Sequence, residues 1–244
     1  MKFRTVGRIF WFAWELLVVT TNYFLTAARA PKDKQRLARA AWLSRSSRRH
    51  LKIFGYSAKV SGEIPKAGLL ISNHLSYLDI LALSATTPAV FVSKAEVRKW
   101  PIFGWCAAIA GTVFVDRERR THVGEVNREI ETALAAGALV VIFPEGTSTN
   151  GEKILPFRTS LLEPAARGNH EISVSWLHYE LKDGDARNEV CYWGDHSFVS
   201  HLLNLLGKKS IRTTIRFGKF HRTTDDRKIL AAQLQEAVTN LSRQ

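Results

Sequence analysis

The sequence has few cysteines and none of the spacings that mark cysteine-based sites. Only Cys106 and Cys191 occur among 244 residues, each in apolar or aromatic surroundings. Two isolated cysteines suit a reducing compartment and argue against a disulfide framework. The eight histidines are scattered and show no paired His or Cys spacing, so the sequence gives no support for a metal site.

Other absences narrow the chemistry. The sequence contains no Gly-x-Ser-x-Gly segment, which argues against the nucleophile elbow of a serine hydrolase. It also contains no internal repeat, no low-complexity tract and no RNA-binding aromatic motif. Acidic residues are outnumbered, with 22 Asp and Glu against 35 Lys and Arg and a net charge of +13. This balance favours polyanionic partners, such as anionic lipid, phosphorylated substrate or nucleic acid.

Residues 9–25 are the most apolar part of the chain and have basic residues on both sides. The stretch is nearly long enough to cross a bilayer, but Glu15 near its centre would cost about 2.5–3.5 kcal/mol there. Glu15 and the aromatic residues around it also argue against reading this stretch as a signal peptide. Because basic flanks favour the cytoplasmic side for both ends, we expect a helix that dips into one leaflet or lies in the interface. The alternative is a helix that crosses the bilayer.

Residues 33–55 form a second expected helix, with apolar residues on one side and Arg45, Arg48, Arg49 and Lys52 on the other. A basic amphipathic helix beside an apolar one is typical of attachment to anionic lipid, and an ordinary packing helix is the alternative. Gly55 suits its C-cap. We therefore expect residues 1–55 to be membrane-anchoring helices on the cytoplasmic face of the cell membrane, and residues 56–244 to form one domain.

In residues 56–244, short apolar strands alternate with helices, which predicts an α/β fold. The expected architecture is a twisted, largely parallel sheet flanked by helices, with the N-terminal helices as a membrane-binding appendage. Strands are expected near 58–61, 68–72, 89–93, 112–115, 138–143, 171–177, 188–193 and 211–217. Helices are expected near 75–86, 101–110, 121–136, 158–168, 198–206 and 225–242.

The strand at 68–72 leads directly into His74, and Asp79 follows five positions later. The junction of strand and helix is where ligands bind in open α/β sheets. Five residues on a regular helix leave two side chains about 140° apart, so the pair meets only if His74 lies in the turn before the helix. A carboxylate could then hold one imidazole nitrogen while the other removes a proton from a hydroxyl. The alternative is a capping histidine and a solvated aspartate.

Three further strands are followed by residues whose side chains could bind a substrate. The apolar strand at 138–143 is followed by Glu145, Gly146 and Thr147. Because the strand is so apolar, we do not expect Glu145 to be only a surface charge. Lys94 follows the strand at 89–93, and Arg117 follows the strand at 112–115. Both cations should face the same edge of the sheet and could grip a phosphate. For Arg117 the alternative is a surface arginine paired with Asp116.

Residues 73–79, Asn-His-Leu-Ser-Tyr-Leu-Asp, and 143–148, Phe-Pro-Glu-Gly-Thr-Ser, resemble two blocks of the glycerolipid acyltransferase family. Its best-known members are the 1-acylglycerol-3-phosphate acyltransferases of bacterial membranes. Residues 100–104 and 111–117 resemble the family's intermediate block, so the match spans about residues 59–177 in order and spacing. The resemblance implies an O-acyltransferase in which His74 is the base, Asp79 is its partner and no enzyme nucleophile is needed. It implies acyl-ACP or acyl-CoA as co-substrate, with no bound cofactor.

The resemblance also implies which residues bind the acceptor. Glu145 and Thr147 would hold its glycerol portion, and Gly146 would let the backbone come close. Arg117 and, less directly, Lys94 would bind its phosphate. Asn73 and Ser76 would orient and support the His74 turn. Backbone amides near Gly146 and Thr147 are the candidates for the oxyanion.

Two departures from the family pattern bear on the acceptor. Ser148 stands where many members that use 1-acylglycerol-3-phosphate have arginine, and residues 172–177 lack the usual proline. We expect 1-acyl-sn-glycerol-3-phosphate as the acceptor, giving phosphatidate, with lyso-ornithine lipid or another lysophospholipid as the alternative. A third hypothesis is a basic protein without catalysis that binds membrane or nucleic acid, with a steep loss of binding as salt rises. Nucleic acid is not an expected partner of the enzyme.

Overall fold

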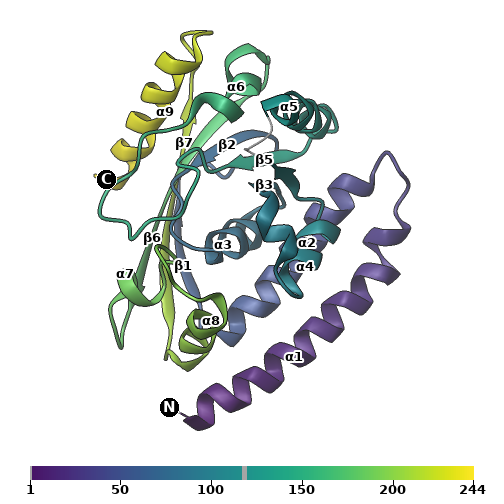
Figure 1. Ribbon diagram of the computed structural model, residues 1–244, viewed down its shortest axis with the longest axis vertical. Helices are drawn as coiled ribbons and strands as arrows, with labels where there is room; N and C mark the ends of the chain where they lie inside the picture. Colours follow the sequence, from purple (N-terminus) through teal and green to yellow (C-terminus); the bar gives the residue numbers. More distant parts are fainter. Residues whose placement is uncertain (1, 117–119) are drawn as a thin grey trace.

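The computed structural model describes residues 2–116 and 120–244, and a seven-stranded sheet forms the centre of this part of the chain (Figure 1). The strand order is β1-β7-β6-β2-β5-β3-β4. All neighbouring strands are parallel except β6 and β7. The largely parallel sheet expected from the sequence is confirmed. The strands are β1 (Ser57–Ser61), β2 (Gly68–Ser72), β3 (Val90–Lys94), β4 (Val113–Val115), β5 (Leu139–Ile142), β6 (Ile172–Leu181) and β7 (Ile211–Phe220).

Helices connect most of the strands and cover both faces of the sheet. They are α1 (Lys2–Leu25), α2 (Gln35–Ile53), α3 (Leu78–Thr86), α4 (Phe103–Ile109), α5 (Arg120–Ala135), α6 (Glu163–Arg167), α7 (Ala186–Glu189), α8 (Phe198–Gly207) and α9 (Arg227–Ser242). Short 3-10 turns occur at η1 (Ala27–Arg29), η2 (Ala95–Lys99) and η3 (Thr159–Leu161).

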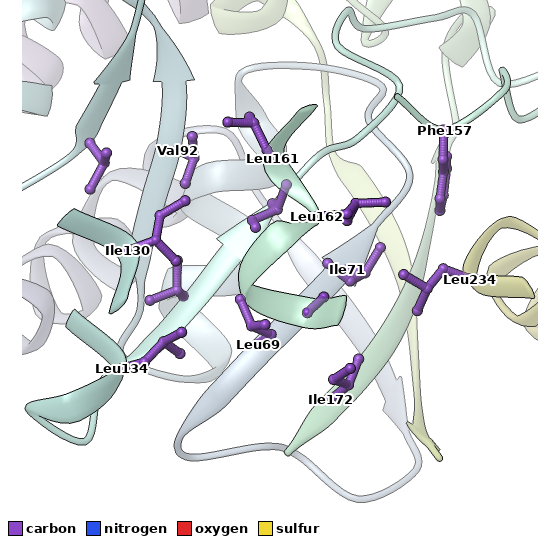
Figure 2. Packing of buried hydrophobic residues seen from close by; sticks show 14 of the residues in the cluster. Leu69, Ile71, Val92, Ile130, Leu134, Phe157, Leu161, Leu162, Ile172 and Leu234 are labelled. Carbon is purple, nitrogen blue, oxygen red and sulfur yellow. The ribbon is translucent and has the colours of Figure 1, made fainter. Parts of the chain in front are cut away.

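Side chains alternate across the central strands and so build two separate cores. On one face Leu69 and Ile71 of β2 pack with residues of α5, α6 and α9. Figure 2 shows Ile130 of α5, Leu234 of α9 and Leu162, which directly precedes α6. On the other face Leu70 packs with residues of α2, α3 and α8. A strand that is buried on both faces reads as a continuous apolar run, which is the pattern seen at β2 and β5.

Two sequence expectations are wrong. Residues 188–193 are not a strand, because the chain forms α7 and then runs irregularly to α8. Val190 and Cys191 fill the core beside β6 and α8 instead of pairing with a neighbouring strand. The helix expected from residue 75 begins at Leu78, so residues 73–77 form a turn of their own.

Helix α1 lies along the outside of the molecule, where it packs on α2 and α8 and touches α4 through Phe12 (Figure 1). Its inward side is mixed, because the buried residues Val19 and Tyr23 lie on it together with Glu15. Glu15 accepts hydrogen bonds from Nε of Arg49 at 2.6 Å and from Trp11. The outward side carries large exposed apolar residues, including Phe10 and Trp14. By length and composition α1 could cross a membrane.

Candidate active site

The candidate site lies at the carboxyl edge of four neighbouring parallel strands, β2, β5, β3 and β4. Loops that follow such strands meet at one edge of the sheet, which is where α/β folds bind ligands. His74 follows β2, Glu145 to Thr147 follow β5, and Lys94 ends β3. Residues from distant parts of the sequence are thereby brought together.

His74 and Asp79 are in direct contact. Nδ1 of the imidazole lies 2.7 Å from Oδ2 of Asp79. The contact is possible because His74 stands in the turn before α3, while Asp79 belongs to the first turn of that helix. The same Oδ2 accepts the backbone N–H groups of Leu75 at 2.7 Å and Ser76 at 3.0 Å. The carboxylate therefore holds the turn before α3 and orients the imidazole at the same time.

The other oxygen of Asp79 has a partner that sequence reasoning missed. Tyr179 of β6 donates its hydroxyl to Oδ1 at 2.7 Å, and both side chains are buried. Burial and the adjacent Asp79 charge raise the pKa of Tyr179 well above its ordinary value, so the phenol stays protonated and remains a donor. The alternation along β6 puts Tyr179 on the same face as Leu177, but no sequence signal joins it to a residue 100 positions away.

The imidazole of His74 also packs against the aromatic ring of Phe143. It stacks on Phe143, with ring centroids 4.2 Å apart and an interplanar angle of 17°. Its side chain is 21% exposed, whereas that of Asp79 is fully buried. Since Nδ1 faces the carboxylate, we assign the neutral tautomer with the proton on Nδ1. Nε2 is then the unprotonated nitrogen and is left for a substrate proton.

Backbone and side-chain hydrogen bonds fix the turn that carries His74. The amide group of Asn73 makes two bonds to the backbone of Leu177, at 3.0 and 2.8 Å, which continues the pairing of β2 with β6 beyond the end of the strand. The carbonyl of His74 accepts from the amide of Thr149, and the carbonyl of Leu75 accepts from the amide of Tyr192. Three loops are thus tied together around the imidazole.

Glu145 links the second loop to the first. Its carboxylate accepts the backbone N–H of His74 with Oε1 and that of Leu155 with Oε2, both at 2.8 Å. Burial raises the pKa of Glu145, and the two amide donors oppose that effect. These two bonds fix the position of the His74 turn relative to the loop after β5.

A cavity of about 270 Å³ opens beside His74 and divides the predicted substrate-binding residues into two groups. Lys94, Gly146 and Thr147 line it. Asn73 and Glu145 are buried and bond to backbone groups, whereas Ser76 is buried and donates its backbone N–H to Asp79. The contact of these three residues with an acceptor stays a prediction. Arg117 lies outside the described residues.

The loop after β5 supplies the candidate donors for an oxyanion. Gly146 has φ +75°, a conformation that glycine adopts without strain, and its N–H donates to the carbonyl of Phe143. That amide is therefore engaged. Thr147 is exposed, and we find no hydrogen bond from it to any residue in 2–116 or 120–244. Its amide and hydroxyl are the better candidates of the two residues.

A second cavity, of about 150 Å³, adjoins the first and is mostly apolar. Tyr77, Ile80 and Trp100 line both cavities. From there the second cavity extends between α1, α2 and α4, where its wall includes Leu16 and Ala107. An apolar space of this kind, adjacent to the cavity at His74, suits a hydrocarbon chain.

Comparisons with known proteins identify the family of this chain. The family model described as Acyltransferase matches residues 57–177. The chain is 35% identical to a lyso-ornithine lipid O-acyltransferase of Brucella abortus over 78% of this chain and 77% of that protein. It is also 35% identical to one of Pseudomonas aeruginosa, over 84% and 78%.

Two further similarities concern acyltransferases of 1-acylglycerol-3-phosphate. A 1-acyl-sn-glycerol-3-phosphate acyltransferase of Neisseria gonorrhoeae is 29% identical over 72% of this chain and 69% of that protein. The crystal structure of a 1-acyl-sn-glycerophosphate acyltransferase from Thermotoga maritima shares the fold, with a TM-score of 0.62, 19% identity and coverage of 99% and 96%. The chain belongs to the glycerolipid acyltransferase family and is an O-acyltransferase.

Proposed function

We propose that this protein moves a fatty acyl group from a thioester, acyl-ACP or acyl-CoA, to the free hydroxyl of a lysolipid at a membrane surface. The observation that carries the proposal is the contact of Asp79 with His74, which lines a cavity that adjoins an apolar one. One cavity can take the acceptor while the other takes the acyl chain. The reacting groups would meet beside Nε2.

The reaction follows from this arrangement. Nε2 of His74 removes the proton of the acceptor hydroxyl as its oxygen attacks the thioester carbonyl carbon. Asp79 stabilises the imidazolium that forms. When the tetrahedral intermediate collapses, the carbon–sulfur bond breaks and the imidazolium returns the proton to the thiolate that leaves. No acyl-enzyme is required, and the amide of Thr147 is the candidate donor to the oxyanion.

We favour lyso-ornithine lipid as the acceptor and keep 1-acyl-sn-glycerol-3-phosphate as the second candidate. Relatives named as lyso-ornithine lipid O-acyltransferases are 34–35% identical to this chain. Ser148, in place of the family's arginine, removes one phosphate donor. The second candidate is supported by the Neisseria relatives, at 29% identity.

The membrane side of the molecule would be the exposed face of α1. Its outward residues are apolar, and the net charge of +13 favours an anionic surface. Because Arg8 and Glu15 of α1 bond to the rest of the protein, we infer that the helix rests in one leaflet rather than crossing the bilayer. The cytoplasmic face follows from the positive charges around the apolar stretch.

The test is an acyl-transfer assay with purified protein in anionic vesicles. One labelled acyl donor is offered with each lysolipid in turn, and wild type is compared with His74→Ala. We expect a loss of about 10²–10⁴-fold in turnover, the usual contribution of a general base, with vesicle binding kept. Acylation of no lysolipid, or full activity of the variant, would contradict the proposal.

A further inference from the structure

One wall of the cavity beside His74 is aromatic. It is built by Trp100 and by residues 192–194, Tyr-Trp-Gly, which lie between α7 and α8. Trp100 and Tyr192 stand nearly perpendicular, with ring centroids 5.9 Å apart and an angle of 79°. Trp193 also lines the cavity, and its indole is fixed because Nε1 donates to the carbonyl of Arg187 at 3.0 Å. The aromatic surfaces are held in place before a ligand arrives.

Ser148 holds this wall against the catalytic loops. Its hydroxyl donates to the carbonyl of Tyr192, and the amide of Tyr192 donates to the carbonyl of Leu75. The residue that departs from the family's Glu-Gly-Thr-Arg pattern is therefore engaged with the aromatic segment. A hydroxyl used in this way positions Tyr192 and Trp193 and is not offered to a phosphate.

Lys94 lines the same cavity at the end of β3, on a strand remote from the aromatic segment in the chain. The aromatic side chains and the lysine suit groups of opposite charge. A cationic group is recognised by aromatic faces, and an anionic group by a lysine.

We infer that the cavity recognises a zwitterionic acceptor headgroup, with Tyr192 and Trp193 binding its ammonium group and Lys94 its carboxylate. This inference rests on the proposed function and assigns the residues that would select the amino-acid headgroup of the favoured acceptor. A cation held by aromatic faces in a desolvated site gains enough free energy to change a rate or binding constant about tenfold. A phosphate headgroup would gain nothing from that wall.

The experiment compares matched acceptors with one labelled acyl donor. Lyso-ornithine lipid is offered beside the same molecule with its side-chain amine acetylated, and beside 1-acyl-sn-glycerol-3-phosphate. For wild type we expect kcat/KM to be about tenfold higher with the free amine than with the acetylated one. Trp193→Phe, which keeps an aromatic face, should retain most of that ratio, and Trp193→Leu should bring it close to one.

Trp176→Leu is the control variant, because Trp176 of β6 lies against the guanidinium of Arg216 and lines neither cavity. It should keep the wild-type ratio. Equal use of the free and acetylated amines by wild type, or faster use of the phosphate acceptor, would overturn the zwitterion inference while leaving lysolipid acylation intact. Acylation of none of the three acceptors would overturn the proposed function itself.

Discussion

At the scale of single residues, the site consists of a chain of hydrogen bonds that runs from the cavity into the core. Asp79 is fully buried, and its two oxygens accept from His74, from two backbone amides and from Tyr179. A buried carboxylate is tolerated only when its lone pairs are satisfied in this way. The Tyr179 hydroxyl therefore helps to fix the position of Asp79, which in turn orients His74.

Tyr179→Phe should lower kcat about tenfold with little change in KM. The variant removes one donor from Asp79, so the carboxylate can shift from the position that orients His74, while the cavity wall is unchanged. Steady-state kinetics with saturating acyl donor measure the two constants separately. An unchanged kcat would show that the two backbone amides alone hold Asp79.

Tyr56→Phe is the matched control for that measurement. Tyr56 is also a largely buried tyrosine close to Asp79, but its hydroxyl is not among the donors to that carboxylate. Burial raises the pKa of Tyr56 to about 12. Removing this hydroxyl should leave kcat within about twofold of wild type, because no bond to the acid is lost.

The sequence could place His74 and Asp79 together, because a histidine in the turn before a helix can reach the first turn of that helix. It could not supply Tyr179 or the bond from Ser148 to Tyr192, since both join residues far apart in the chain. Glu145 was predicted as an acceptor ligand from the family pattern. Its two bonds to backbone amides depend on how the loops after β2 and β5 meet, which spacing alone does not determine.

At the scale of elements, α8 is joined to the start of α3 by a buried histidine. His201 of α8 lies 3.0 Å from the hydroxyl of Tyr77 through Nδ1 and is 6% exposed. Burial lowers the pKa of His201 from 6.5 to about 4. The neutral imidazole is therefore the form that the packing of these two helices accommodates.

Acid should weaken this packing between pH 6.5 and about pH 4. In that window the unfolded chain binds a proton at His201 and the folded chain does not, so the free energy of unfolding falls as pH falls. The contribution is at most about 1.4 kcal/mol per pH unit. Urea unfolding of wild type and His201→Gln at several pH values measures it. Parallel pH profiles for the two proteins would contradict the assignment.

The apolar cavity between α1, α2 and α4 should set the length of the acyl chain. Ala107→Leu adds volume on the α4 wall of that cavity, so we expect the preferred acyl chain to become shorter by two or more carbons. Competition between acyl donors of different length measures the preference. Ala108→Leu on the same helix is the control, since Ala108 does not line the cavity. An unchanged preference in the first variant would mean that the chain lies elsewhere.

Most elements were predictable because apolar runs of strand length alternate with helical patterns. The error at residues 188–193 has a physical cause, since a short apolar run looks alike whether it pairs or fills a core. Val190 and Cys191 fill a core. The cavities were not predictable at all, because α1, α2 and α4 supply their walls only after they pack on one another.

At the scale of the whole molecule, the exposed face of α1 should decide membrane binding. Trp14→Ser removes a large apolar side chain that is 61% exposed, so we expect weaker co-sedimentation with anionic vesicles by about tenfold. Val60→Ser on the edge strand β1, also exposed, is the control and should bind as wild type does. Equal binding by the two variants would contradict the placement of α1. Residues 1–55 as the anchor stay a prediction until that result.

The ion pair between Glu15 of α1 and Arg49 of α2 affects how the enzyme meets its substrates. Glu15 and Arg49 hold the helix against the protein, so drawing α1 deeper into hydrocarbon would separate two opposite charges in an oily medium. With α1 resting on a bilayer as proposed, the cavity mouth stays at one depth. Lysolipids must then arrive by lateral diffusion within the leaflet, and turnover should follow their mole fraction in the surface and not their amount per volume of solution.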